Sequence, residues 1–362
     1  MPTRGCWRRR LIVTRGSLIR LAILGIVLVV AAVWGYLSMI RMPGRSFEGP
    51  LPPLSESQQV LRDELREHVR VLAGEIGPRN VFHPAGLVRA EGHLTETLAA
   101  MGYGVERQTF EAEGIACSNL IVEIPGRAAA EEIVIVGAHY DTCGGTPGAD
   151  DNASAVAATL ALAKRLAGTQ PRRTLRFVLF VNEEPPFFRT EQMGSLRYAR
   201  RCAAGDERIV AMICLEMIGY FSAEPGSQRY PLPGLGLLYP DRGDFIAFVG
   251  NFRSRRLLRE VVAAFRHDAS LPSEGAALPG WVPGIGLSDH WSFWKAGYAD
   301  RAIMVTDTAM FRNPHYHAAS DTPETLDYAR LARVVTGLEV VLRRRAEVQG
   351  VPADPPHRDP PQ

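Results

Sequence analysis

The chain is short of cysteine, of net charge and, in its first 47 residues, of acidic side chains. Its five cysteines among 362 residues have spacings that match no zinc-finger pattern. A formal net charge of +2 lacks the basic excess typical of nucleic-acid-binding proteins. With 46% hydrophobic and 22% charged residues, the composition excludes disorder, collagen and coiled coil as the main architecture. We therefore expect a globular protein with no nucleic-acid partner and one or two domains.

The missing acidic residues coincide with a long hydrophobic run. Eight arginines and no acid precede Glu48, which leaves 33 basic and 39 acidic residues, a charge of −6, on the rest of the chain. Residues 21–40 are uncharged, about the length that a helix needs to cross a bilayer core. Because six arginines precede the run and two follow it, the positive-inside rule predicts a single-pass protein with a cytoplasmic N-terminus and an extracytoplasmic body.

A cleaved signal peptide is the alternative interpretation of this run. Its apolar region is normally shorter and ends in small residues, whereas this run ends at Met39 and Ile40, which favours an uncleaved anchor. Beyond the bilayer, disulfides become possible, although single buried thiols fit equally well. The cysteines concerned are Cys117, Cys143, Cys202 and Cys214.

Five segments are predicted along the chain. Residues 1–20 form a basic cytoplasmic tail, 21–40 the membrane anchor, 41–55 a linker rich in Pro and Gly, 56–348 one large domain, and 349–362 a disordered Pro-rich tail. Within the domain, short apolar strand patterns alternate with helical ones. This alternation predicts a three-layer α/β/α fold with a mostly parallel central sheet. The expected strands cover 119–124, 133–138, 175–181, 209–215, 244–249 and 302–306.

Histidines and carboxylates follow several of these strands, where open α/β sheets bind their ligands. Each has an ordinary explanation when taken alone, such as helix capping by Asp150 and Asp151 or a solvated loop position for His317. Their joint occurrence at strand ends instead favours a metal site. The residues concerned are His139, Asp141, Asp150, Asp151, Glu183, Glu184, Glu216 and His317.

Two imidazoles with several carboxylates suit zinc, which accepts nitrogen and oxygen ligands. The set is larger than one catalytic zinc requires, because such an ion usually takes three protein ligands and a water molecule. Two zinc ions that share a bridging carboxylate would use all of the donors. We therefore expect two ions, with one ion as the alternative.

Six short motifs occur in an order that resembles the zinc aminopeptidase family, which also includes glutamate carboxypeptidases and glutaminyl cyclases. The resemblance covers roughly residues 56–345, and the set of motifs is specific although no single motif is. The motifs are Gly137-Ala-His-Tyr-Asp141, Gly148-Ala-Asp-Asp-Asn-Ala-Ser154, Asn182-Glu-Glu184, Leu215-Glu-Met-Ile-Gly219, Ser288-Asp-His290 and Tyr316-His317.

The resemblance implies a role for each matched residue. One zinc would be bound by His139, Asp151 and Glu216, and the other by Asp151, Glu184 and His317, with Asp151 as the bridge. Glu183 would be the general base and acid, and Tyr316 resembles the residue that steadies the oxyanion in some relatives. Asp141 would orient His139, while Asp289 and His290 would support the site. Asp150 is the alternative bridging residue, although the motif register favours Asp151.

The implied activity is that of a membrane-anchored zinc exopeptidase, an aminopeptidase acting on peptides. Many relatives have Asp in place of Glu216, and the extra methylene moves the carboxylate by roughly 1.5 Å. A single-zinc glutaminyl cyclase is therefore one alternative, and a non-catalytic binding protein on the same fold is another. Residues 221–286 are expected to supply both ordinary sheet elements and a rim over the site.

Overall fold

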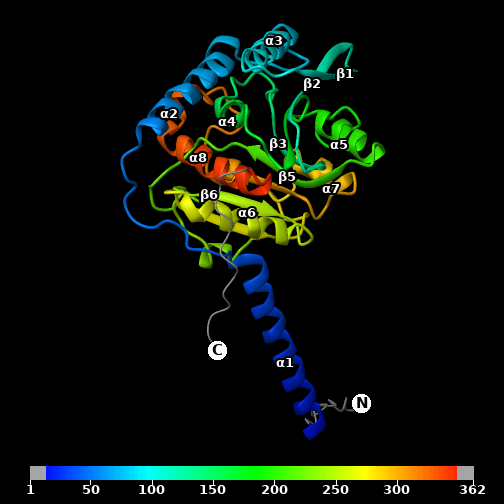
Figure 1. Cartoon of the computed structure of the whole chain (residues 1–362). Helices are drawn as coiled ribbons and strands as arrows, with labels where there is room; N and C mark the ends of the chain where they lie inside the picture. Colours follow the sequence, from blue (N-terminus) through cyan, green and yellow to red (C-terminus); the bar gives the residue numbers. More distant parts are fainter. Residues whose placement is uncertain (1–13, 349–362) are drawn as a thin grey trace, which may run out of the picture.

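The computed structural model describes residues 14–348, so most of the predicted basic tail and the whole Pro-rich tail lie outside the described residues. Eight strands form one mixed sheet in the order β1-β2-β4-β3-β5-β8-β6-β7 (Figure 1). The strands are β1 (Glu106–Ala112), β2 (Ile115–Ile124), β3 (Ala129–His139), β4 (Arg173–Phe180), β5 (Arg208–Glu216), β6 (Ile246–Gly250), β7 (Ser273–Ala277) and β8 (Ala302–Thr306).

The four central strands β4, β3, β5 and β8 run parallel to one another. On one side β2 pairs antiparallel with β4, and β1 pairs antiparallel with β2. On the other side β6 runs antiparallel to β8, and β7 is parallel to β6. The predicted α/β class is confirmed, with a parallel centre and antiparallel pairings toward both edges.

Helices cover both faces of the sheet and form the two outer layers (Figure 1). One face carries α2 (Glu56–Val69), α3 (Pro84–Ala100), α4 (Ala155–Leu166), α6 (Arg255–Asp268) and α8 (Tyr328–Arg345). The other face carries α5 (Gly194–Ala204) and the short α7 (His290–Lys295). Because successive side chains of a strand point to opposite faces, Val134 and Val136 of β3 pack under the first layer, and Ile133 and Ile135 under the second.

The carboxyl ends of the central strands lie level with one another. His139 at the end of β3 is paired with Phe180 at the end of β4, and Glu216 at the end of β5 is paired with Thr306 at the end of β8. A parallel arrangement brings these ends to the same edge of the sheet. The loops that leave this edge therefore meet in space, although they are far apart in the sequence.

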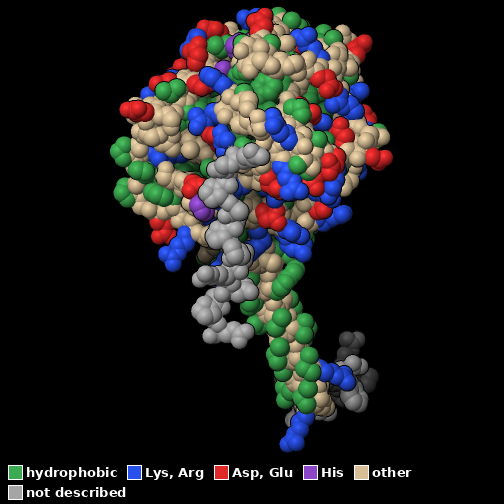
Figure 2. Space-filling model, viewed as in Figure 1, with side chains coloured by type: hydrophobic (Ala, Val, Ile, Leu, Met, Phe, Trp, Pro, Cys, Tyr) green, Lys and Arg blue, Asp and Glu red, His purple; other side chains and the backbone are tan. Residues whose placement is uncertain are grey.

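A long apolar helix projects from the domain on the opposite side from α3 (Figure 1). It consists of α1 (Arg15–Gly35) and a wider π-type turn over Tyr36–Ile40. Together they are long and apolar enough to cross a membrane, and α1 buries none of its side chains in the protein. Figure 2 shows this stalk as mainly hydrophobic, below a domain whose visible face mixes acidic and basic side chains.

The described cysteines form no disulfide. Cys117, Cys202 and Cys214 are buried as single thiols, and Cys143 is half-buried. Of the two possibilities left open by the sequence, the structure therefore shows free thiols at these four positions.

Candidate metal centre

The end of β3 places His139 at the centre of a cluster of carboxylates. Its imidazole is completely buried, and Nε2 lies 3.4 Å from Asp151 Oδ1 and 3.4 Å from Glu216 Oε2. Glu183 Oε2 is slightly farther away, at 3.9 Å from the same nitrogen. The opposite ring nitrogen, Nδ1, lies 3.4 Å from Asp141 Oδ1. One nitrogen of His139 thus faces the carboxylate cluster, and Asp141 holds the other.

His317 approaches the same cluster from the loop beyond β8. Its Nε2 lies 3.3 Å from Asp151 Oδ2 and 3.2 Å from Glu184 Oε2. Asp151 therefore directs one carboxylate oxygen toward each histidine and lies between them. The arrangement contains two groups of donors that share Asp151: His139 with Glu216, and His317 with Glu184.

Two buried aspartates fix the loops that carry these donors. The carboxylate of Asp141 accepts the backbone N–H groups of Glu183 and Glu184, each at 3.1 Å. The carboxylate of Asp321 accepts the N–H groups of Asp150 and Asp151, at 2.9 and 3.1 Å. Since a carboxylate has two acceptor oxygens, each aspartate holds two consecutive residues in place.

Glu216 is fixed by its own hydrogen bonds. Ser288 donates its hydroxyl to Glu216 Oε2 at 2.6 Å. The other oxygen of this carboxylate, Oε1, does not take part in this hydrogen bond. Asn152 holds the end of β5 by donating its amide to the carbonyl of Leu215 at 3.0 Å and by accepting the N–H of Met217 at 2.9 Å. The carboxylate of Glu216 is therefore held in one position beside His139.

The chain turns sharply where several of these residues are presented. Asn182, Met217 and His317 have positive φ angles of 59°, 44° and 54°. Residues other than glycine rarely adopt this left-handed conformation, and it clusters at functional sites where the surrounding structure holds it. Each of these three residues is a candidate ligand or adjoins a predicted site residue, so part of the described backbone strain lies where donors are directed into the cluster.

The remaining predicted residues surround the cluster at different distances. Asp150 points away from both histidines, because its carboxylate accepts the N–H of Gly219 and the amide of Asn313, so it does not lie in a bridging position.

His290 Nε2 bonds to the carbonyl of Ile285 at 2.7 Å and therefore supports that loop. Burial lowers its pKa to about 4. Burial raises the pKa of Asp289 to about 7, against the opposing charge of His139.

The buried carboxylates of the cluster would be stabilised by a bound cation. Burial and nearby carboxylates raise the pKa of Glu184 to about 8, and burial raises that of Glu183 well above its usual range. Burial alone would lower the pKa of His139, but Glu216 and the other carboxylates outweigh it and raise it well above its usual range. No arginine or lysine of residues 14–348 forms an ion pair with the four carboxylates that are more than nine-tenths buried here. These carboxylates belong to Asp151, Glu183, Glu184 and Glu216.

Two buried polar atoms in the cluster also lack a hydrogen-bond partner among the described residues. They are Nε2 of His139 and Oε1 of Glu184, and both belong to predicted zinc ligands. Buried polar groups are rarely left without a partner, because this costs free energy. Donor atoms of His139, Asp151 and Glu216 lie within 4.8 Å of one another, as a shared ion requires. The donor set therefore fits divalent zinc.

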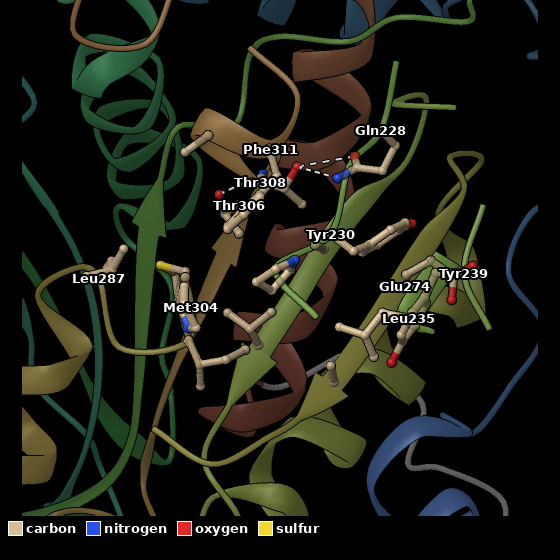
Figure 3. A pocket seen from close by; sticks show the side chains of 18 of the residues that line it. Gln228, Tyr230, Leu235, Tyr239, Glu274, Leu287, Met304, Thr306, Thr308 and Phe311 are labelled. Carbon is tan, nitrogen blue, oxygen red and sulfur yellow. Dashed lines mark hydrogen bonds between the residues drawn. The ribbon is translucent and has the colours of Figure 1, made fainter. Parts of the chain in front are cut away.

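A large apolar pocket adjoins the cluster. It encloses about 850 Å³, part of which is open to solvent, and Glu216, Leu287 and Tyr316 line both this pocket and the cavity over the carboxylates. In Figure 3, Leu287 and Met304 lie toward one side of the pocket, and Leu235, Tyr239 and Glu274 lie toward the other. Residues 221–286, which include β6 and β7, supply most of this far wall, so the segment contributes sheet elements and lines the apolar pocket. The residues that line the cavity over the carboxylates come from outside this segment, so the expected rim over the site stays a prediction.

Sequence reasoning missed several residues that shape the site. Asp321 and Asn152 were given no role, and Ser288 was quoted only as part of a motif. Tyr316, which was assigned a role, stacks on His317 with ring centroids 3.8 Å apart. Asp321 lies in a polar loop with no strand pattern, so the sequence carries no local signal for its function.

The fold belongs to the same class as that of the zinc aminopeptidases. A zinc aminopeptidase from Bacillus subtilis superposes with a TM-score of 0.64 over 80% of this chain and 95% of that chain, at 14% sequence identity. A glutaminyl cyclase from Bacteroides thetaiotaomicron, solved with bound N-acetylhistamine, gives a TM-score of 0.58 over 81% and 98%, at 17% identity. At such identities these structures show the fold alone.

The chain belongs to peptidase family M28, whose profile matches residues 119–341. An uncharacterised Escherichia coli protein, YfbL, is 38% identical over 288 residues, which cover 77% of this chain and 87% of that protein. A probable leucine aminopeptidase from Trichophyton verrucosum is 28% identical over 60% of this chain, which spans about half (55%) of that relative. The family membership supports a peptidase-type hydrolase, and it implies zinc.

We predict that Asp141→Asn weakens zinc binding by about 10- to 100-fold, the range found when residues that orient metal ligands are changed. An amide has one acceptor oxygen, so it loses one of the two backbone N–H bonds that fix Glu183 and Glu184. Competition with a chromogenic chelator measures the affinity. Asp300→Asn is the control, since Asp300 is half-exposed beside Arg301. An unchanged affinity in Asp141→Asn would show that Asp141 does not position the donors.

Proposed function

We propose that the chain is a membrane-anchored zinc aminopeptidase with two metal ions. The observation that carries the proposal is the position of Asp151, whose two carboxylate oxygens face the two histidines separately. His139 and Glu216 would complete the ligand set of one ion, and His317 and Glu184 would complete that of the other. Zinc held there would supply Lewis acidity and would lower the pKa of a water molecule enough to make it a nucleophile at neutral pH.

Glu183 is the residue best placed to move protons. It lines the open cavity together with Glu184 and Tyr316, and it lies farther from His139 than Asp151 and Glu216 do. In this position Glu183 accepts the proton of the attacking water and then donates it to the leaving amine of the peptide. A carboxylate with no ligand role of its own is free to do both.

Tyr316 is placed to stabilise the oxyanion. Its ring is held by stacking on His317, and it lines the same cavity as Glu183. Burial, together with the carboxylates around it, raises the pKa of its hydroxyl, so the group keeps its proton and can donate a hydrogen bond. Such donors, fixed before the reaction, stabilise the charge that develops on the carbonyl oxygen.

We predict that Glu183→Gln lowers kcat by about 10²- to 10⁴-fold and leaves the zinc content unchanged, because the amide cannot act as a base. Amino acid release from peptide amides and zinc analysis on the same sample of full chain measure both quantities. Glu191→Gln, at an exposed position, is the control. Wild-type activity in Glu183→Gln would exclude the assigned role.

The same samples separate the peptidase from its alternatives. Two zinc ions per chain with release of free amino acids support the aminopeptidase. One zinc ion with formation of pyroglutamate from peptides that begin with glutamine would instead identify a cyclase. Absence of both activities in the zinc-loaded chain would favour a binding protein.

The apolar pocket beside the cluster gives the proposed enzyme its preference. Its far end is lined mainly by large apolar and aromatic side chains, with Glu274 among them, and this lining favours a bulky apolar residue at the N-terminus of the substrate. Leu235 and Leu237 belong to the same short helix, but Leu235 lines the pocket whereas Leu237 is 90% exposed. The pair therefore offers a matched test.

We predict that Leu235→Trp lowers kcat/KM for phenylalanine amide by about tenfold or more and changes alanine amide much less, since the indole fills the space for a large side chain. Steady-state kinetics with both amides measure the ratio. Leu237→Trp should leave it unchanged. Equal losses for the two substrates would contradict a role of this pocket in side-chain selection.

The apolar helix is proposed to anchor this domain beyond the cytoplasmic membrane. Arg259 donates to the carbonyls of Leu37 and Arg41 at 3.0 and 2.6 Å, which ties the domain to the end of the helix. The exposed apolar side chains of α1 have no protein partner in the described chain, and a bilayer would cover them. The arginines before residue 21 orient the span.

We predict that alkaline phosphatase fused to the C-terminus is active and that the fusion stays in the membrane after a carbonate wash, because the helix spans the bilayer with its basic end inside. Replacement of Arg8, Arg9 and Arg10 by Gln should reduce phosphatase activity by weakening the orientation signal. An inactive fusion that stays in the membrane would show the opposite orientation. A fusion released by carbonate would show that the helix is not a membrane anchor.

A further inference from the structure

Cys143 lies at the edge of the metal cluster and had no part in the sequence prediction of ligands. It follows β3 in the loop that begins at Tyr140, and it is half-buried. Its sulfur, a carboxylate oxygen of Glu184 and a ring nitrogen of His317 all lie within 4.8 Å of one another. Cys143 therefore joins the side of the cluster where His317 and Glu184 meet Asp151.

Hydrogen bonds hold the backbone around Cys143 on both sides. The buried amide of Asn80 donates to the carbonyl of Thr142 at 2.7 Å and to the carbonyl of Gly144 at 2.6 Å. The carbonyl of Cys143 accepts from the N–H of Thr146 at 3.0 Å and from its hydroxyl at 2.8 Å. The thiol is thus presented by a fixed loop.

A separate observation indicates that a ligand belongs at this position. Oε1 of Glu184 is buried and has no hydrogen-bond partner among residues 14–348, while Oε2 of the same carboxylate faces His317. A cation placed among Glu184, His317 and Asp151 would pair the unpartnered oxygen. The sulfur of Cys143 lies within 4.8 Å of donor atoms of Glu184 and His317, which are two of these three residues.

We infer that the Cys143 thiolate is a ligand of the metal ion at His317, in addition to Asp151 and Glu184. The inference rests on the proposed metal centre and deepens it. Binding would release the thiol proton to solvent, since the metal coordinates the thiolate. The donor set at this position would then contain one sulfur, one nitrogen and two carboxylates.

This donor set would make the two metal positions unequal. Four protein ligands are typical of closed zinc sites, whereas three leave a position open for water or substrate. The position at His139, with Asp151 and Glu216, would be the open one. A thiolate also favours thiophilic ions such as zinc, cobalt or cadmium over magnesium and manganese, so the position at His317 should retain its ion more firmly.

Cobalt(II) makes the thiolate visible, because a cobalt–sulfur bond gives an intense charge-transfer band in the near ultraviolet. The experiment uses the full chain in detergent, stripped of metal and titrated with cobalt(II), and compares the wild type with Cys143→Ser and Cys202→Ser. Cys202 is the control because it lies on α5, is completely buried and is outside the cluster. We expect the band in the wild type and in Cys202→Ser, and its loss in Cys143→Ser.

Alkylation of the wild type provides a second readout that needs no variant. Cys143 is half-buried, whereas the other three described cysteines are buried. Burial and the surrounding carboxylates raise the pKa of its thiol, so iodoacetamide is applied at alkaline pH, where it should modify Cys143 in the metal-free chain and zinc should protect it. Peptide mapping identifies the modified residue. The inference stands if the band depends on Cys143 and zinc protects this thiol.

The inference is overturned if cobalt(II) binds without the band, if the band persists in Cys143→Ser, or if zinc leaves the alkylation of Cys143 unchanged. In those cases two bound ions and peptide hydrolysis would still support the proposed function. A chain that binds neither cobalt nor zinc would overturn both.

Discussion

Burial of four carboxylates around two imidazoles is the constraint on which the rest of this structure depends. Charges removed from water must be paired, and no arginine or lysine of the described chain forms an ion pair with these carboxylates. The buried Arg79 is near enough to interact electrostatically with Asp151 and Glu184, but its guanidinium donates to the carbonyls of Tyr140, Pro147 and Gly148. The fold is therefore arranged to concentrate negative charge at one edge of its sheet, where a divalent cation would stabilise it.

The supporting structure of the site repeats one device on its two sides. Asp141 and Asp321 each accept two consecutive backbone N–H groups, and each thereby fixes a loop that carries candidate ligands. Burial raises the pKa of Asp321 to about 7, so the Asp150 and Asp151 N–H groups that it accepts matter for keeping its charge. Positioning in this centre thus comes from backbone donors, which leave the oxygens of Asp151 free to face the histidines.

The sequence allows prediction of those strands that have a clear local pattern of apolar residues. The strand at Ala302–Thr306 was predicted with the bounds that the structure shows, because a short apolar run enters a sheet that is covered on both faces. β1 was missed because its residues, Glu106–Ala112, are mostly exposed and polar, as an edge strand allows, and β7 was missed because Ser273–Ala277 contains small residues with no apolar alternation. Propensity gives little signal for either strand.

The same distinction applies to the candidate site. His139 and Glu216 could be selected because they end apolar strands, where position alone suggests a ligand. Asp321 holds Asp151 across 170 residues of sequence, and Ser288 holds Glu216 across 72, so their function exists only once the chain has folded. Cys143 could not be selected from the sequence for the same reason, since its nearness to His317 depends on the loop that Asn80 fixes.

The pocket connects the candidate site to the end of the apolar helix. Tyr239 lines the far wall and donates its hydroxyl to the carbonyl of Gly275 in β7. β7 itself packs against the turn at Tyr36–Ile40, where α1 ends. The wall that would select the substrate side chain therefore rests on the end of the proposed anchor.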